Sequence, residues 1–133
     1  MNIVAKAIVR DAYANILILQ RSGSHPQYAL EADLPGGIVE SAEDPITAVI
    51  REIEEETGII VTEDNVRFLH QRTTLSQSGH LLFDVFINLP KPVVKLSWEH
   101  ENYVWVSKED FALNINTTDD YMIVVDEWLS TQS

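Results

Sequence analysis

The sequence predicts an α/β protein, with a mixed β-sheet and two helices packed on it. Short runs of β-branched and aromatic residues, separated by turn residues, recur along most of the chain and are typical of strands. Two segments instead carry apolar residues at helical spacing. Of the 133 residues, 45% are hydrophobic, enough for a packed core. No repeat or linker is visible, so we expect one domain spanning residues 1–133.

The strand pattern can be followed along the chain from its beginning. A turn at 11–14 lies between the first two runs, which predicts a hairpin or an adjacent strand pair. Residues 34–37, Leu-Pro-Gly-Gly, predict a glycine turn, and residues 73–79 a polar loop. Pro90 ends the strongest strand, and the run at 59–69 contains a polar turn. The expected strands are residues 2–10, 15–20, 59–69, 81–89 and 103–106.

Two helices are predicted from periodicity and end signals. The first begins after Asp44, a suitable N-cap, and ends before Gly58, a residue type common just beyond a helix. The second is expected over residues 119–129, with Thr117 and Asp120 as a capping pair. The first helix has one apolar face of the width that packs on a core. That face consists of Ile46, Val49, Ile50 and Ile53.

A second face of the first helix is acidic. Glu52, Glu55 and Glu56 stand at i, i+3 and i+4, so they fall within about 100° of arc. Like charges at this spacing destabilise a helix by about 0.2–0.5 kcal/mol per pair, which favours a divalent cation over them. Arg51 can pair with Glu55 one turn away and hold the neighbouring acids. The small side chain of Ala48 is expected to leave room there for a ligand.

The amino-acid composition limits the kinds of partner and metal ligand that the protein is expected to have. The net charge of −12, with only 9 Lys and Arg residues, argues against binding of a nucleic-acid polymer. The sequence has no cysteine, so any metal ligands are oxygen atoms or imidazoles. No apolar run approaches the ~20 residues needed to cross a bilayer, and the N-terminus lacks a signal-peptide pattern. We therefore expect a cytoplasmic protein with no membrane partner.

Several residues outside the first helix are candidates for ligand binding. Arg21, at a strand end, either grips a phosphate group or is a solvated strand terminus. Three histidines in expected loops are candidates for phosphate binding, and three aromatic residues for base stacking, each with an ordinary surface or packing role as the alternative. These residues are His25, His80 and His100, and Trp98, Tyr28 and Phe83.

The acidic helix belongs to a longer pattern that resembles the signature of the Nudix hydrolases. All nine specified positions of that signature match, and a chance match is on the order of 10⁻⁷ for a chain of this length. The Leu-Pro-Gly-Gly lead-in and the order of elements are also similar to the family. One departure is Ala42, where the family usually has glycine. The matching residues are Gly37, Glu43, Arg51, Glu52, Ile53, Glu55, Glu56, Gly58 and Ile59.

This resemblance implies an α/β/α sandwich that hydrolyses a nucleoside diphosphate linked to another moiety, with Mg²⁺ or Mn²⁺ as cofactor. It makes Glu52, Glu55 and Arg51 catalytic, with Glu52 either a metal ligand or a general base that Arg51 orients. Glu43 is implied to be structural. A further acid ahead of Trp105 is implied, for which Glu99 is favoured over Glu101. The implied metal ligands are the Gly36 carbonyl, Glu52, Glu55, Glu56 and Glu99.

The substrate is less well defined by the sequence. The absence of Pro and Tyr from residues 61–89 favours a nucleoside triphosphate pyrophosphohydrolase over ADP-ribose, nucleotide-sugar or dinucleoside polyphosphate pyrophosphatases. Asn116 or Asn114 is a candidate for reading a purine, although Asn is common in turns. A nucleotide sensor that does not cleave its ligand and a structural protein with an acidic coat are the remaining alternatives. The substrate, the bond cut and a homodimer stay open.

Overall fold

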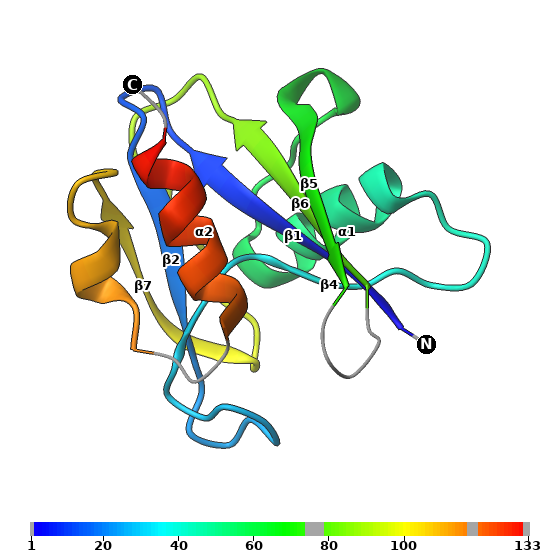
Figure 1. The fold of residues 1–133 in the computed structure, drawn as a ribbon, viewed down its shortest axis with the longest axis horizontal. Coiled ribbons are helices and arrows are strands. Elements are labelled where there is room, and N and C mark those ends of the chain that lie inside the picture. Colours follow the sequence, from blue (N-terminus) through cyan, green and yellow to red (C-terminus); the bar gives the residue numbers. More distant parts are fainter. Residues whose placement is uncertain (1, 74–78, 117–119, 132–133) are drawn as a thin grey trace.

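The computed structural model describes residues 2–73, 79–116 and 120–131. A mixed sheet lies between two helices, with α1 behind it and α2 in front (Figure 1). The predicted α/β fold with two main helices is confirmed. The elements are β1 Ile3–Arg10, β2 Ile16–Arg21, β3 Ala32–Asp33, β4 Gly36–Ile38, α1 Pro45–Thr57, β5 Val66–Thr73, β6 Gly79–Phe86, β7 His100–Val106 and α2 Asp120–Ser130, with 3₁₀ turns at Glu63–Asn65 and Phe111–Asn114.

Strand β1 organises the sheet. It runs parallel to β6 along its whole length, and its first half pairs antiparallel with β4. It pairs with β2 only through Arg10 and Ile16, next to the turn. The predicted pair of adjacent strands is therefore present, but the two strands separate beyond this first pair. Strand β2 then pairs antiparallel with β3 and β7, while β5 pairs antiparallel with β6. This arrangement brings β4, which precedes α1, beside the N-terminal half of β1.

Each face of the sheet packs on one helix because side chains alternate along the strands. Ala5, Ala7 and Val9 of β1 face the core that contains Val49 and Ile53 of α1. Ile8 faces the other core, with Met122, Val125 and Leu129 of α2. In the described part of the chain, no helix is long and apolar enough to span a membrane.

Several predicted boundaries were wrong. Residues 59–61 form no strand, because the chain there leaves α1 and enters a 3₁₀ turn. Gly36 and Gly37 form part of strand β4 rather than a turn. The β6 strand ends at Phe86, before Pro90, and β7 already begins at His100. Residues 74–78 of the predicted polar loop and Thr117 of the predicted capping pair lie outside the described residues.

Candidate active site

Helix α1 forms as its local sequence predicts. The Asp44 side chain accepts a hydrogen bond from the Ile46 N–H at 2.8 Å, and Pro45 occupies the first turn. Gly58 ends the helix with φ 75°, a left-handed conformation that glycine adopts without a steric penalty. Ala48, however, is fully buried. The expectation that Ala48 leaves room for a ligand was wrong, because its position on the helix is covered by packing.

The three glutamates of the acidic face differ in burial. The side chain of Glu55 is 56% exposed, that of Glu52 is 13% exposed and that of Glu56 only 2%. Glu56 accepts a hydrogen bond from the Gly36 N–H at 2.7 Å. Burial raises the pKa of Glu56 to about 8, and the nearby carboxylates of Asp33 and Glu52 add to the rise. The acidic face thus runs from solvent into the interior.

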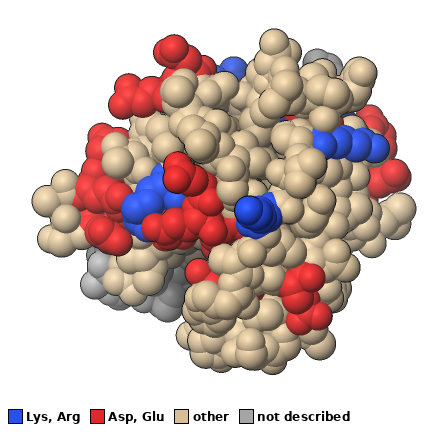
Figure 2. Space-filling model, turned by 180° about the vertical axis from the view of Figure 1, so that it is seen from behind, with Lys and Arg blue, Asp and Glu red and all other residues tan. Residues whose placement is uncertain are grey.

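Arg51 forms ion pairs with the acidic residues at the solvent-exposed end of this face. Its Nε and Nη2 donate to the Glu43 carboxylate at 2.9 and 3.0 Å, in a bidentate pair. Its Nη1 donates to Glu52 at 3.0 Å and lies 3.4 Å from both Glu55 oxygens. Hydrogen bonding to Arg51 lowers the pKa of Glu43 to about 2. Figure 2 shows basic atoms surrounded by acidic ones on this side of the molecule.

The two glycines of β4 let the backbone approach the acids closely. A Cβ atom at Gly37 would lie 2.7 Å from the carboxyl carbon of Glu52, and one at Gly36 only 2.1 Å from the Ala5 oxygen. Gly36 also has φ 139°, which disfavours any other residue. The Gly36 carbonyl lies 3.5 Å from the Lys6 ammonium group. Glycine is therefore required where the strand passes the carboxylates.

The donor set suits a hard divalent cation, although the side chains are not gathered as ligands. Among the described residues, no three acidic or histidine side chains form a group that could hold a metal ion. The reason is local, since Arg51 engages Glu52 and Glu55 while Glu56 turns towards Gly36. Carboxylate and carbonyl oxygens beside a glycine-lined backbone are nevertheless what Mg²⁺ and Mn²⁺ prefer. The chemistry of these donor atoms therefore fits such an ion.

Glu99, in the loop before β7, interacts electrostatically with this group. Burial raises the pKa of Glu52, opposed by Arg51 and reinforced by the carboxylates of Glu55 and Glu99. Glu99 therefore lies close enough to Glu52 to interact electrostatically. The side chain of Glu101, by contrast, accepts a hydrogen bond from the Gly23 N–H at 2.7 Å. Its position favours a structural role for Glu101.

Sequence reasoning missed a buried charged network behind Glu56. The Lys6 ammonium group donates to Asp33 at 2.9 Å, and the other Asp33 oxygen lies 2.9 Å from His100 Nε2. His100 Nδ1 is in turn 3.9 Å from Glu56. Nearby cationic and hydrogen-bonding groups hold the pKa of Asp33 below its usual range despite its burial. A lysine within an apolar, β-branched strand was the signal that could have revealed this network.

Two of the three histidines expected in loops lie in strands instead, His80 in β6 and His100 at the start of β7. His100 is 3% exposed and belongs to the buried network. His25 lies in the loop after β2, where its ring stacks on Trp98 with centroids 6.1 Å apart. Phe83 is buried in the core under α1, so it cannot stack on a base.

Arg21 is not a solvated strand terminus. Its Nη2 lies 3.4 Å from Asp33, its Nη1 is 3.1 Å from His25 Nε2, and its guanidinium carbon lies 5.6 Å from the ring centre of Tyr28. His25 Nε2 is also 3.8 Å from Glu99. Arg21 therefore connects the buried network to the loop that carries Glu99. Its side chain is mostly buried, which favours a positioned cation over a surface one.

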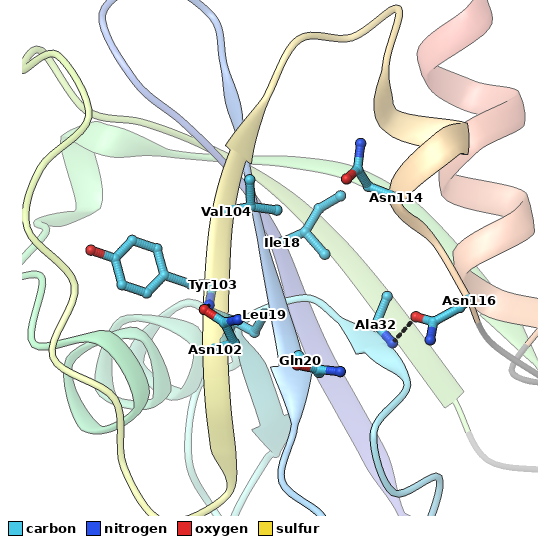
Figure 3. Close-up of a pocket in the computed structure, with 9 residues that line it drawn as sticks. All are labelled: Ile18, Leu19, Gln20, Ala32, Asn102, Tyr103, Val104, Asn114 and Asn116. Atoms are coloured by element: carbon cyan, nitrogen blue, oxygen red, sulfur yellow. Dashed lines mark hydrogen bonds between the residues drawn. The ribbon is translucent and has the colours of Figure 1, made fainter.

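Asn116 borders a separate pocket of about 180 Å³ (Figure 3). Its side-chain oxygen accepts a hydrogen bond from the Ala32 N–H at 3.1 Å, and its amide nitrogen lies 3.4 Å from the Leu30 carbonyl. None of the glutamates of α1 is among the residues that line this pocket. Its lining comes from both cores, because Ile18 and Ala32 belong to the core on the α2 side and Leu19 to the core under α1. The lining residues are Ile18, Leu19, Gln20, Ala32, Asn102, Tyr103, Val104, Asn114 and Asn116.

Comparison with known proteins places this arrangement in a family. Residues 2–126 match the model of the NUDIX domain, and the chain belongs to the Nudix family. It is similar to the MutT protein from Methanosarcina mazei, whose crystal structure is 30% identical and superposes with a TM-score of 0.77 over 97% of this chain and 92% of that chain. The predicted family and sandwich fold are thereby confirmed.

Two curated proteins are also similar to parts of the chain. An ADP-ribose pyrophosphatase from Saccharomyces cerevisiae is 26% identical over 124 residues, which cover 89% of this chain and 51% of that protein. An 8-oxo-dGTP diphosphatase from Haemophilus influenzae is 39% identical over 57 residues, or 43% of this chain and 41% of that protein. The aligned parts thus span about half the length of these curated relatives.

Proposed function

We propose that the protein is a metal-dependent hydrolase of phosphoric anhydride bonds in nucleotides. Its substrate is a nucleoside diphosphate linked to another moiety, and we favour a nucleoside or deoxynucleoside triphosphate that is cut to release pyrophosphate. The observation that carries this proposal is the contact of Arg51 with Glu43, Glu52 and Glu55 beside Gly37. These residues belong to the sequence signature, and the names of both curated relatives support cleavage of such a bond.

Each residue of the group has a proposed role. Glu52, Glu55, Glu56 and Glu99 would hold Mg²⁺ or Mn²⁺ together with the Gly36 carbonyl. When bound, the ion screens the negative phosphate oxygens and makes a water molecule more nucleophilic. Arg51 orients the glutamates, since its guanidinium group already contacts two of them. Glu52 or Glu99 is the general base that takes the proton from the attacking water.

Two further residues are proposed to bind the substrate. Arg21 carries a positive charge near the loop of Glu99, where phosphate oxygens would gather. Asn116 is proposed to bind the base, with the pocket of Figure 3 as its site. Because its amide already bonds to the backbone at Ala32, it would act mainly by shaping the pocket wall.

A second candidate substrate is ADP-ribose. It is favoured by the Saccharomyces cerevisiae relative, which aligns with 89% of this chain and is named an ADP-ribose pyrophosphatase. The Haemophilus influenzae relative has the higher sequence identity, but its alignment covers a shorter part of this chain. The two candidates share the same acidic helix and would differ in the residues that bind the group beyond the diphosphate.

A panel assay tests the proposal. The protein is incubated with Mg²⁺ and nucleoside triphosphates, ADP-ribose, nucleotide sugars or dinucleoside polyphosphates, and the products are separated by anion-exchange chromatography. Product separation is needed because ADP-ribose and nucleotide sugars are cut to a nucleoside monophosphate and a sugar phosphate, whereas a nucleoside triphosphate releases phosphate or pyrophosphate. We expect turnover of at least one nucleotide that is lost in EDTA. Tight binding without turnover across the panel would instead favour a nucleotide sensor. Mg²⁺ should also raise the melting temperature by mass action, and no rise would favour a structural protein.

A further inference from the structure

A second hollow lies far from the acidic helix, where the C-terminal end of β1 meets the last turn of α2. Its volume of about 450 Å³ is within the range typical of small-molecule sites. The β1–β2 turn, strand β5, the segment after β7 and the end of α2 all contribute to it. The lining residues are Arg10, Tyr13, Ala14, Asn15, Ile16, Arg67, Ser107, Lys108, Glu109, Trp128 and Leu129.

Basic residues are concentrated in this hollow. Arg10, Arg67 and Lys108 line it, three of the 9 Lys and Arg residues in a chain of net charge −12. A single acidic side chain, Glu109, is among the lining residues. The hollow is therefore a positively charged site in a negatively charged protein, which favours an anionic ligand.

A buried carboxylate holds the two arginines side by side. Arg10 donates through Nε and Nη2 to the two oxygens of Asp84 at 2.7 and 2.6 Å, and Arg67 Nη2 lies 3.2 Å from the same carboxylate. The side chain of Asp84 is 6% exposed. Asp84 pairs with Arg67 across β5 and β6, and with Ile8 across β1 and β6, so the sheet register fixes the cluster.

The charges of this cluster do not balance. Two guanidinium groups share one carboxylate, so the cluster of Arg10, Arg67 and Asp84 carries one net positive charge. The other two charged lining residues, Lys108 and Glu109, have opposite charges. Each guanidinium group has five N–H donors, of which Asp84 engages two from Arg10 and one from Arg67. Arginine side chains that are already positioned bind an oxyanion at a lower entropic cost. Tyr13 and Trp128 offer flat surfaces in the same hollow.

We propose that this hollow binds the phosphate group of a small anion through Arg10 and Arg67. The ligand is either free phosphate or a phosphate monoester with a ring that packs on Tyr13 and Trp128. The site is separate from the proposed active site. It lies at the C-terminal end of β1 and on the α2 side, whereas β4 brings the acidic helix to the N-terminal half of β1 on the other side.

Calorimetric titration of the full chain tests this proposal. Inorganic phosphate, AMP and adenosine are titrated in EDTA at 0.15 M salt, so that the metal-dependent function plays no part in the result. We expect saturable binding of phosphate or AMP, and none of adenosine. Tighter binding of AMP than of phosphate would identify a monoester as the ligand, and equal binding would identify free phosphate. The absence of saturable binding of either anion would overturn the proposal.

Two matched variants locate the bound anion. Arg67→Gln removes a 70% exposed guanidinium group while the Arg10–Asp84 pair remains, so the fold should be kept. We expect this change to weaken binding at least tenfold. Lys95→Gln removes the same charge from an exposed position elsewhere and should leave the affinity unchanged. Equal affinity of Arg67→Gln and the wild type for the anion would overturn the proposal. An equal loss of affinity in Arg67→Gln and Lys95→Gln would also overturn it, because it would indicate only an effect of net charge.

Discussion

Burial of Glu56 predicts that the metal-free protein loses stability as the pH rises. Desolvation raises the pKa of this carboxyl group from 4.5 to about 8 in the folded state. The folded protein therefore binds more protons than the unfolded chain between these values, and stability falls with increasing pH. The contribution is fully present below pH 4.5 and is lost as the pH rises through about 8.

The size of the effect follows from the two pKa values. At ~1.36 kcal/mol per pKa unit, the rise from 4.5 to about 8 corresponds to at most ~5 kcal/mol. We expect Glu56→Gln to abolish this dependence because an amide of the same shape carries no charge at any pH. The wild type and the Glu56→Gln variant contain the same charged and titratable groups around position 56. These groups are Lys6, Asp33, His100 and Glu52.

Urea unfolding in EDTA between pH 5 and pH 9 measures the effect. The free energy of unfolding of the wild type, minus that of Glu56→Gln at the same pH, should fall by about 2–5 kcal/mol across this range. Using the difference removes titrations that both proteins share. A difference that stays constant from pH 5 to pH 9 would refute the argument that Glu56 is protonated in the folded metal-free protein.

Three further substitutions test other parts of the structure. Glu55→Gln should lower turnover by orders of magnitude with little change in melting temperature, because the side chain is 56% exposed; wild-type activity would contradict its assignment as a metal ligand. Ala42→Gly should stabilise the protein by about 1 kcal/mol in urea unfolding, since Ala42 has φ 63°, and a loss of stability would contradict this reasoning. Lys6→Met should cost about 3 kcal/mol in the same assay, because it leaves Asp33 with one cation fewer, and a cost below about 1 kcal/mol would show that Arg21 and His100 suffice.

Local rules explain why helix α1 could be predicted residue by residue. Asp44 caps it, Gly58 ends it in the left-handed conformation, and Val49 and Ile53 are buried, all as expected. Each of these features depends on neighbours within about one turn of the chain. The left-handed conformation of Ala42 also has a sequence signal, because the resemblance placed glycine at that position.

The differences among the three glutamates could not be predicted in the same way. Spacing on a helix shows that Glu52, Glu55 and Glu56 share a face, but it does not show what covers that face. Glu56 is buried because β4 supplies the Gly36 N–H and because His100, far along the chain, reaches its other side. Such contacts depend on the pairing of β4 with β1 and of β7 with β2, which no local pattern specifies.

The contacts of Arg51 give a physical reason for the length of the signature. Its guanidinium group binds Glu43 before the helix, donates to the Ile38 carbonyl at 3.3 Å, and contacts Glu52 on the helix itself. A single planar group thus joins strand β4, the following loop and α1. The same strand carries Gly37, whose lack of a side chain admits Glu52. Residues spread from Gly37 to Glu56 therefore act as one unit, because a shift of the loop would displace Arg51 and with it the acids.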